Sequence, residues 1–109
     1  MPAPDAIRLL VMTCPEDQAD HLLATLLTER LIACGNIIPG VLSRYWWQGE
    51  LCRDAEVLVL METAADRVDA AITRLAAIHP YDVAKILAFT PVAGHAPYLE
   101  WVHNVTREL

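Results

Sequence analysis

The sequence has no run of basic residues. Its 8 lysines and arginines are scattered among 14 acidic residues, which gives a formal net charge of -6. Nucleic-acid binding needs clustered positive charge, so this balance argues against DNA or RNA as a partner. No apolar segment approaches the roughly 20 residues that a membrane-spanning helix needs, and we expect no membrane span. The stretch from Met1 to Ala6 also lacks the basic region of a signal peptide.

Several sequence motifs for cofactors and metals are missing as well. Neither Gly-x-Gly-x-x-Gly nor Gly-x-x-x-x-Gly-Lys occurs, so nucleotide binding has no support. The three cysteines, Cys14, Cys34 and Cys52, form no Cys-x-x-Cys pair, and a structural zinc site is not expected. No carboxylate pair has a spacing that indicates hydrolysis, so we do not expect an enzyme. An odd number of separated cysteines fits a reducing compartment, which predicts the cytoplasm.

The chain is rich in apolar residues. They make up 55% of its 109 residues, enough for the full core of a single domain spanning 1–109. Their spacing predicts a strand over 7–13, a helix over 15–31, two strands between 33 and 63, a second helix ended by Pro80, a strand over 82–90, and a short helix near 98–105. Thr13 with Glu16, and Thr63 with Asp66, have capping-box spacing, so we expect side-chain caps there, although the first N-cap could be Thr13 or Cys14.

The most unusual stretch is the predicted pair of strands in the middle of the chain. The first runs from Cys34 to a predicted two-residue turn at Gln48-Gly49, with a bulge or bend at Pro39-Gly40. The return strand reaches Thr63, with an interruption expected at Asp54-Ala55. Strands average about five or six residues, and a lone two-stranded arm is not stable. This arm must therefore lie on the rest of the chain or on other copies.

The order strand, helix, strand, strand, helix, strand is that of an α+β, ferredoxin-like split βαβ fold. Right-handed crossovers place both helices on one face of a four-stranded antiparallel sheet. The other face would be bare and apolar, which implies a partner surface. We expect a homo-oligomer whose sheets pack together and whose long hairpin arms pair across subunits.

With these elements in place, the residues resemble the CutA divalent-cation tolerance family over nearly the whole chain. The motifs that carry the resemblance are Thr13-Cys14-Pro15, the run from Ala33 to Gly40, Tyr45-x-Trp47-x-Gly49, His79-Pro80-Tyr81 and Tyr98-x-x-Trp101. The resemblance implies a ferredoxin-like subunit, a tight homotrimer and a likeness to the PII signalling proteins. It also implies a link to tolerance of divalent metals such as copper, with no established catalytic reaction.

The sequence departs from the family pattern at two places that carry charge. After His79-Pro80-Tyr81 the family commonly continues with an acid, a hydrophobe, Pro and Glu, whereas this chain has Asp82, Val83, Ala84 and Lys85. Before Thr63 the family usually has lysine, and this chain has Glu62. The two changes look like a charge exchange, and we expect an ion pair with its ends swapped if the side chains meet.

Cys34, His79 and His103 are the candidate ligands for copper or another divalent metal, because copper favours thiolate and imidazole. Each also has a structural interpretation. Cys34 can be a small buried hydrophobe, His79 can cap a helix C-terminus, and His103 can be an exposed helix residue. Cys14 lies at a predicted helix start, where a thiol becomes reactive unless it is buried.

A second candidate site is a cleft between subunits that would bind a small ligand. Its predicted residues combine aromatic and charged side chains, and they are Tyr45, Trp47, Glu62, Tyr81, Asp82, Lys85, Tyr98 and Trp101. The alternative is that the aromatic members are packing residues of the subunit interface, where tyrosine and tryptophan are enriched.

Overall fold

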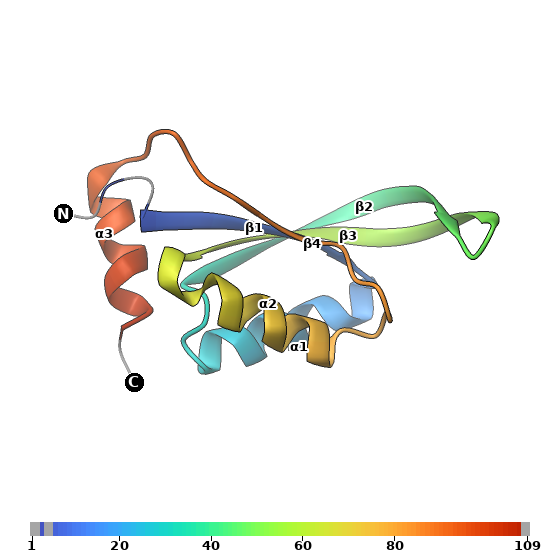
Figure 1. Cartoon of the computed structure of the whole chain (residues 1–109), viewed down its shortest axis with the longest axis horizontal. Helices are drawn as coiled ribbons and strands as arrows, with labels where there is room; N and C mark the ends of the chain where they lie inside the picture. The colour runs from blue at the N-terminus through green and yellow to red at the C-terminus, as the bar shows by residue number, and fades with distance from the viewer. Residues whose placement is uncertain (1–2, 4–5, 108–109) are drawn as a thin grey trace.

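The computed structural model describes residue 3 and residues 6–107. The elements are β1 (Ile7–Cys14), α1 (Glu16–Thr28), β2 (Cys34–Trp47), β3 (Glu50–Ala64), a short 3-10 turn η2 (Ala65–Arg67), α2 (Val68–Ile78), β4 (Ile86–Phe89) and α3 (Ala96–Val105). Their order confirms the predicted sequence of strands and helices (Figure 1). None of the helices in the described residues is long and apolar enough to cross a bilayer.

The four strands form one antiparallel sheet in the order β2-β3-β1-β4. Helices α1 and α2 lie together on one face of it (Figure 1). Alternate residues of β1 and β3 point into the layer between sheet and helices, as the period of two requires. The buried core there includes Leu10, Met12, Val57, Val59 and Met61 from the sheet and Leu22, Leu26, Ala71 and Leu75 from the helices.

The long hairpin arm has the predicted bulge and turn. Ile38 pairs with Leu58 and Val41 pairs with Glu56, so Pro39 and Gly40 lie together opposite a single β3 residue. Gly40 has φ of 76°, a left-handed conformation that glycine adopts without strain. Proline has no N–H to donate, so a bulge is where a strand accommodates it. The arm therefore bends where the sequence predicts.

Within the described residues, no third strand lies beside the outer half of the arm. The ladder between β1 and β3 ends where Cys14 pairs with Val57, while β3 continues outward to Glu50. The arm projects from the body in Figure 1, and the molecule measures 47 × 28 × 22 Å. At its tip, Gln48 and Gly49 have φ of 49° and 82°, as the tight hairpin turns with positive φ require.

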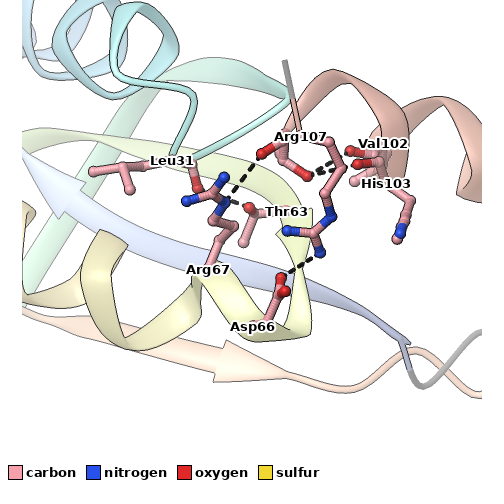
Figure 2. A network of polar contacts seen from close by, with 8 residues as sticks. Leu31, Thr63, Asp66, Arg67, Val102, His103 and Arg107 are labelled. Carbon is pink, nitrogen blue, oxygen red and sulfur yellow. Dashed lines mark hydrogen bonds and ion pairs between the residues drawn. The ribbon is translucent and has the colours of Figure 1, made fainter. Parts of the chain in front are cut away.

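Both predicted capping boxes are wrong. Helix α1 begins after Pro15, which has no side chain that can cap, and Thr13 belongs to β1. Thr63 likewise lies in β3, and its hydroxyl donates to the carbonyl oxygen of Leu31 at 2.7 Å (Figure 2). In both places the strand continues through the threonine, because the strand's ladder bonds and burial outweigh a local cap.

Three predicted boundaries also differ from the structure. Helix α1 ends at Thr28 and not at position 31. The fourth strand is only Ile86–Phe89, shorter than the 82–90 expected from its apolar residues. The interruption expected at Asp54-Ala55 is absent, since these residues pair regularly with Ser43 and Leu42. A turn-forming aspartate is tolerated there because its side chain is exposed.

The second face of the sheet is covered in part by helix α3, at the end of the sheet where Ile7 lies. Helix α3 packs there, and Leu99 and Val102 form a small buried cluster with Ile7 and Ala33. Among the described residues, the β4 edge of this face has no cover, and Leu87 and Phe89 of β4 are about half exposed, at 49% and 50%. An apolar sheet surface of this kind is suited to contact with another molecule.

Side chains from η2 and the end of α3 hold that helix in place (Figure 2). The Arg67 Nε donates to the carbonyl oxygen of Thr106 at 3.0 Å, and Arg107 pairs with Asp66. The Thr106 hydroxyl donates back to the carbonyl of Val102 and closes the last helical turn. These contacts fix α3 against the sheet and therefore fix the side chains that it presents to β2 and β3.

Candidate functional site

Three side chains meet at the covered end of the sheet, and we call them the thiol cluster: Cys34, Glu62 and Tyr98. The β2–β3 register pairs Cys34 with Glu62 directly, and α3 supplies Tyr98. The Cys34 thiol donates to Glu62 Oε1 at 3.2 Å, and the Tyr98 hydroxyl donates to the same oxygen at 2.9 Å. The Cys34 sulfur and the Tyr98 oxygen are 3.1 Å apart. One sulfur and two oxygens thus form a closed triangle.

The surroundings keep the thiol and the phenol of this cluster protonated. Burial raises the pKa of Cys34, although the hydrogen bond with Tyr98 opposes that shift. Burial also raises the pKa of Tyr98, and its hydrogen bonds with Cys34 and Glu62 act in the same direction. Trp101 stacks beside Tyr98, with ring centroids 5.9 Å apart. A cation that displaces the thiol proton would therefore find the Cys34 sulfur and two oxygen atoms available as ligands.

His79 is committed to structural bonds. Its ring is buried, with Nε2 2.9 Å from the carbonyl oxygen of Thr13. Its Nδ1 accepts the backbone N–H of Tyr81 at 3.1 Å. Because Nδ1 is an acceptor, Nε2 carries the hydrogen that is donated to Thr13, and neither nitrogen is left for a metal.

The predicted metal ligands are not brought together. Thr13, which His79 binds, pairs with Leu58, while Cys34 pairs with Glu62. The two pairs are four residues apart along β3, about 13 Å at roughly 3.3 Å per residue. His103 lies half-buried on α3, and no group of three or more His, Cys, Asp or Glu side chains in the described residues is arranged to hold a metal ion. A third protein ligand beside Cys34 and Glu62 would therefore have to be a residue such as Tyr98 or a residue of a second copy.

A groove of about 850 Å³ runs between the arm and the segment that follows α2. It brings together part of the predicted cleft set, namely Tyr45, Trp47, Tyr81, Asp82 and Lys85. The other members of that set, Glu62, Tyr98 and Trp101, belong to the end of the sheet described above. Within the described part of one chain, the predicted cleft is therefore two separate sites.

Glu56 is the groove residue that sequence reasoning missed. It is buried, and its Oε2 accepts the Tyr81 hydroxyl at 2.9 Å. Burial raises the pKa of Tyr81, and the bond to Glu56 adds to the shift. Farther out, a hydrogen bond to Asp54 raises the pKa of Tyr45 to about 12. The sequence did contain a signal for this residue, because Glu56 directly precedes the apolar strand residues 57–61.

Two further predictions concern charge and reactivity. Glu62 and Lys85 form no ion pair with each other within the described residues of a single chain.

Cys14 is fully buried, and burial raises its pKa to about 11, with Glu56 and Asp17 contributing. The expectation that burial would make Cys14 unreactive is thus supported, and this thiol is poorly suited to act as a nucleophile.

The comparison with known proteins rests on both sequence and fold. The family model described as CutA1 divalent ion tolerance protein matches residues 8–105. The chain belongs to this family. A CutA relative from Thermus thermophilus, named a divalent-cation tolerance protein, is 37% identical over 99 residues, which cover 90% of this chain and 96% of the relative. The names of the family and of this relative indicate no catalytic activity.

Other relatives are longer than this chain. The CutA proteins of Bos taurus and Oryza sativa are 33% and 40% identical, with 97% and 92% of this chain covered. The matched part is 60% and 57% of their own lengths, so the chain spans well under two thirds of them. Among solved structures, CutA from Xylella fastidiosa superposes with a TM-score of 0.88 at 38% identity, covering 94% of this chain and 99% of that one. CutA folds therefore match the α+β sheet and helices described above.

Proposed function

We propose that this chain is a divalent-cation tolerance protein that acts as a homotrimer and binds copper or a similar ion weakly at the thiol cluster. The observation that supports the proposal most directly is the triangle of Cys34 sulfur, Glu62 oxygen and Tyr98 oxygen, with all three separations at or below 3.2 Å. Sulfur and oxygen donors of this kind suit copper and zinc. The metal would supply positive charge that stabilises the thiolate of Cys34.

The same residues predict how binding depends on pH. A thiol must lose its proton to become a ligand, so metal competes with protons for Cys34. The raised pKa of Cys34 makes this competition stronger at neutral pH. Weak binding that tightens as the pH rises is the expected behaviour.

The experiment is a calorimetric titration of the reduced protein with Zn²⁺ and, without oxygen, with Cu⁺. We expect Cys34→Ser to weaken binding at least tenfold and Glu62→Gln to weaken it by a smaller factor. Cys52→Ser is the matched control, because that thiol lies on the arm outside the cluster. Equal affinity in wild type and Cys34→Ser would refute a metal site at this cluster, whatever the oligomeric state.

The trimer is supported by the surfaces that one chain leaves uncovered. Leu87 and Phe89 are half exposed on the second face of the sheet, and no further strand of the described residues lies beside the outer arm. Sedimentation equilibrium tests the state, and a monomer at tens of micromolar protein would overturn this part of the proposal. The free thiols of Cys14, Cys34 and Cys52 fit a reducing compartment, and we keep the cytoplasm as the proposed location.

A second candidate function is that of a PII-like trimer that binds a small molecule or a protein partner. The groove supports it, because about 850 Å³ lies within the usual range for small-ligand sites. Its lining mixes apolar residues such as Val41 and Trp46 with charged groups, among them Lys85, Asp82 and Glu56. A thermal-shift screen of nucleotides and organic acids tests this function, with Lys85→Ala as the variant that should lose any response. No shift with any compound would count against it.

The charge exchange between Glu62 and Lys85 remains a proposal for the assembled protein. The two residues lie in different sites of one chain, so a contact between them requires a neighbouring subunit. Lys85→Glu should then lower trimer stability, and adding Glu62→Lys should restore it. Equal stability of the single and double variants would exclude the contact. Lys85→Glu is the cleaner single variant, because Glu62 also binds Cys34 and Tyr98.

A further inference from the structure

Two tyrosine–carboxylate pairs lie next to each other along β3. The Tyr81 hydroxyl donates to Glu56 Oε2 at 2.9 Å, and the Tyr45 hydroxyl donates to Asp54 Oδ2. Glu56 and Asp54 are two residues apart in one strand, so their side chains leave the same face of it. Their Cα atoms are roughly 6.6 Å apart, at about 3.3 Å per residue. We call Tyr45, Asp54, Glu56 and Tyr81 the acid–tyrosine site.

Glu56 is the buried acid of this site, and one of its oxygens opens into the groove. The residue is only 6% exposed, and its Oε2 is occupied by Tyr81. Its Oε1 accepts no hydrogen bond from the described residues, yet no side-chain oxygen among them is both fully enclosed and unbonded. Oε1 is therefore reached from the groove that Glu56 lines. A largely buried carboxylate favours a cation or a hydrogen-bond donor at such an oxygen.

The two phenols remain donors at neutral pH and so leave one oxygen of each acid available. The bond to Asp54 raises the pKa of Tyr45 to about 12, and the charge of Glu56 adds to the shift. Burial and the bond to Glu56 raise the pKa of Tyr81, and the charge of Asp54 acts in the same direction. Each acid thus acts on both phenols, which places the two pairs within one electrostatic site.

The basic residues nearby do not neutralise the two acids. Arg44, which borders the groove, is the ladder partner of Arg53, and both side chains leave the other face of the arm. Lys85 lines the groove from the segment after α2, and Asp82 of the same segment balances its charge. The acid–tyrosine site therefore favours a positively charged ligand.

Aromatic rings complete the wall beside the acids. Tyr45, Trp47 and Tyr81 all line the groove. Ammonium groups are attracted to the faces of such rings, and methylene groups gain from apolar contact with them. A linear alkane diamine combines these properties, because it carries two ammonium groups joined by a short apolar chain. In a short diamine the separation of the nitrogens is comparable with the two-residue repeat of a strand.

We propose that the acid–tyrosine site binds an alkane diamine or a longer linear polyamine, with one ammonium on Glu56 Oε1 and the next on the free oxygen of Asp54. The rings of Tyr45 and Tyr81 contact the methylene chain between them. The net charge of -6 attracts polycations to the protein as a whole, and the paired acids fix the ligand in the groove. This ligand class goes beyond the functions proposed above, since it requires neither the thiol cluster nor Lys85.

The test is a calorimetric titration of the reduced protein with putrescine, a short alkane diamine, at low ionic strength. The monoamine of the same chain length, n-butylamine, should bind at least tenfold more weakly. Glu56→Gln keeps the size and the acceptor for Tyr81 but removes the charge, and it should weaken putrescine binding at least tenfold. Asp54→Asn should weaken it by a smaller factor. Asp69→Asn is the matched control, because it removes the same charge from an exposed position in the first turn of α2 and should leave the affinity unchanged.

Several results would overturn the inference. They are no binding of putrescine, equal affinity in wild type and Glu56→Gln, and equal affinity for putrescine and n-butylamine. A loss in Asp69→Asn as large as in Glu56→Gln would also refute it, because net charge alone would then hold the diamine. Lys85→Ala separates this inference from the second candidate function, since it should abolish responses to organic acids without weakening putrescine binding. Circular dichroism checks folding, and the exposed change Asp54→Asn carries the test if Glu56→Gln is unfolded.

Discussion

The Nε2 of His79 lies 2.9 Å from the carbonyl oxygen of Thr13, which ties the end of α2 to the end of β1. The other ring nitrogen accepts the N–H of Tyr81. His79→Ala removes the partner of the buried Thr13 carbonyl and of the partly buried Tyr81 N–H, so we expect the free energy of unfolding to fall by about 2–4 kcal/mol. Urea denaturation measures this loss. His79→Gln, which retains a donor, should lose less, and a smaller loss for alanine than for glutamine would contradict the assignment.

The bond from Thr63 to Leu31 is a second test of buried polar pairing. Thr63 is fully buried in β3, and its hydroxyl reaches the chain just after α1 (Figure 2). Thr63→Val keeps the shape and removes the donor, so we expect a loss of about 1–2 kcal/mol in urea denaturation. Thr25→Val is the control, because its hydroxyl bonds the His21 carbonyl in an exposed helix. Similar losses at both positions would show that burial does not decide the cost.

Gly35 has no room for a side chain. A Cβ there would lie 2.4 Å from Leu23 Cδ2, in the layer between β2 and α1. Gly35→Ala should therefore cost about 1–3 kcal/mol through overpacking, and Leu23→Ala in the same chain should recover part of it. Gly40→Ala meets no atom within 4 Å, but its φ of 76° is unfavourable for alanine. Its cost of about 1 kcal/mol should not depend on Leu23. Thermal melts of the two glycine variants, of Leu23→Ala and of the two double variants separate the two causes.

Cys14 makes stability depend on alkaline pH. Its folded pKa is raised to about 11 by burial, so the folded chain holds this proton more tightly than the unfolded chain. The associated stability is complete below the ordinary pKa of 9.0 and is lost as the pH rises toward 11. A loss of about 1–3 kcal/mol is expected over that window. Urea melts of wild type and Cys14→Ala at pH 8 to 11 measure it. Parallel pH profiles for the two proteins would exclude Cys14 as the cause.

The sequence predicted the order of the elements because apolar period and turn residues are local signals. Pro39-Gly40 and Gln48-Gly49 marked the bulge and the hairpin turn, where the structure has them. The capping boxes failed because a threonine at a strand end can bond across the fold, as Thr63 does to Leu31. That contact joins residues 32 positions apart, and no local pattern reveals it.

The candidate site was predicted in part for the same reason. The sequence singled out Cys34, Glu62 and Tyr98, but it placed the first among metal ligands and the other two in a cleft. Their meeting depends on the β2–β3 register and on where α3 docks, which the spacing of residues does not fix. Glu56 was missed because a lone acid in a strand usually faces solvent. Here it binds Tyr81, which the chain returns to only after α2.

The tight turn at Gln48-Gly49 also bears on the order of folding. It joins neighbours in sequence, and hairpins of this kind form in about 1–10 μs, whereas β1 must find β3 and β4 across long loops. A newly made chain therefore forms this ribbon transiently before its sheet is complete, because a lone hairpin is only marginally stable. Exposed apolar ribbons invite aggregation, and flanking charges suppress it. Arg44, Arg53 and Asp54 thus act as gatekeepers during synthesis, which would make charge removal on the arm a cause of poor expression even where stability is unchanged.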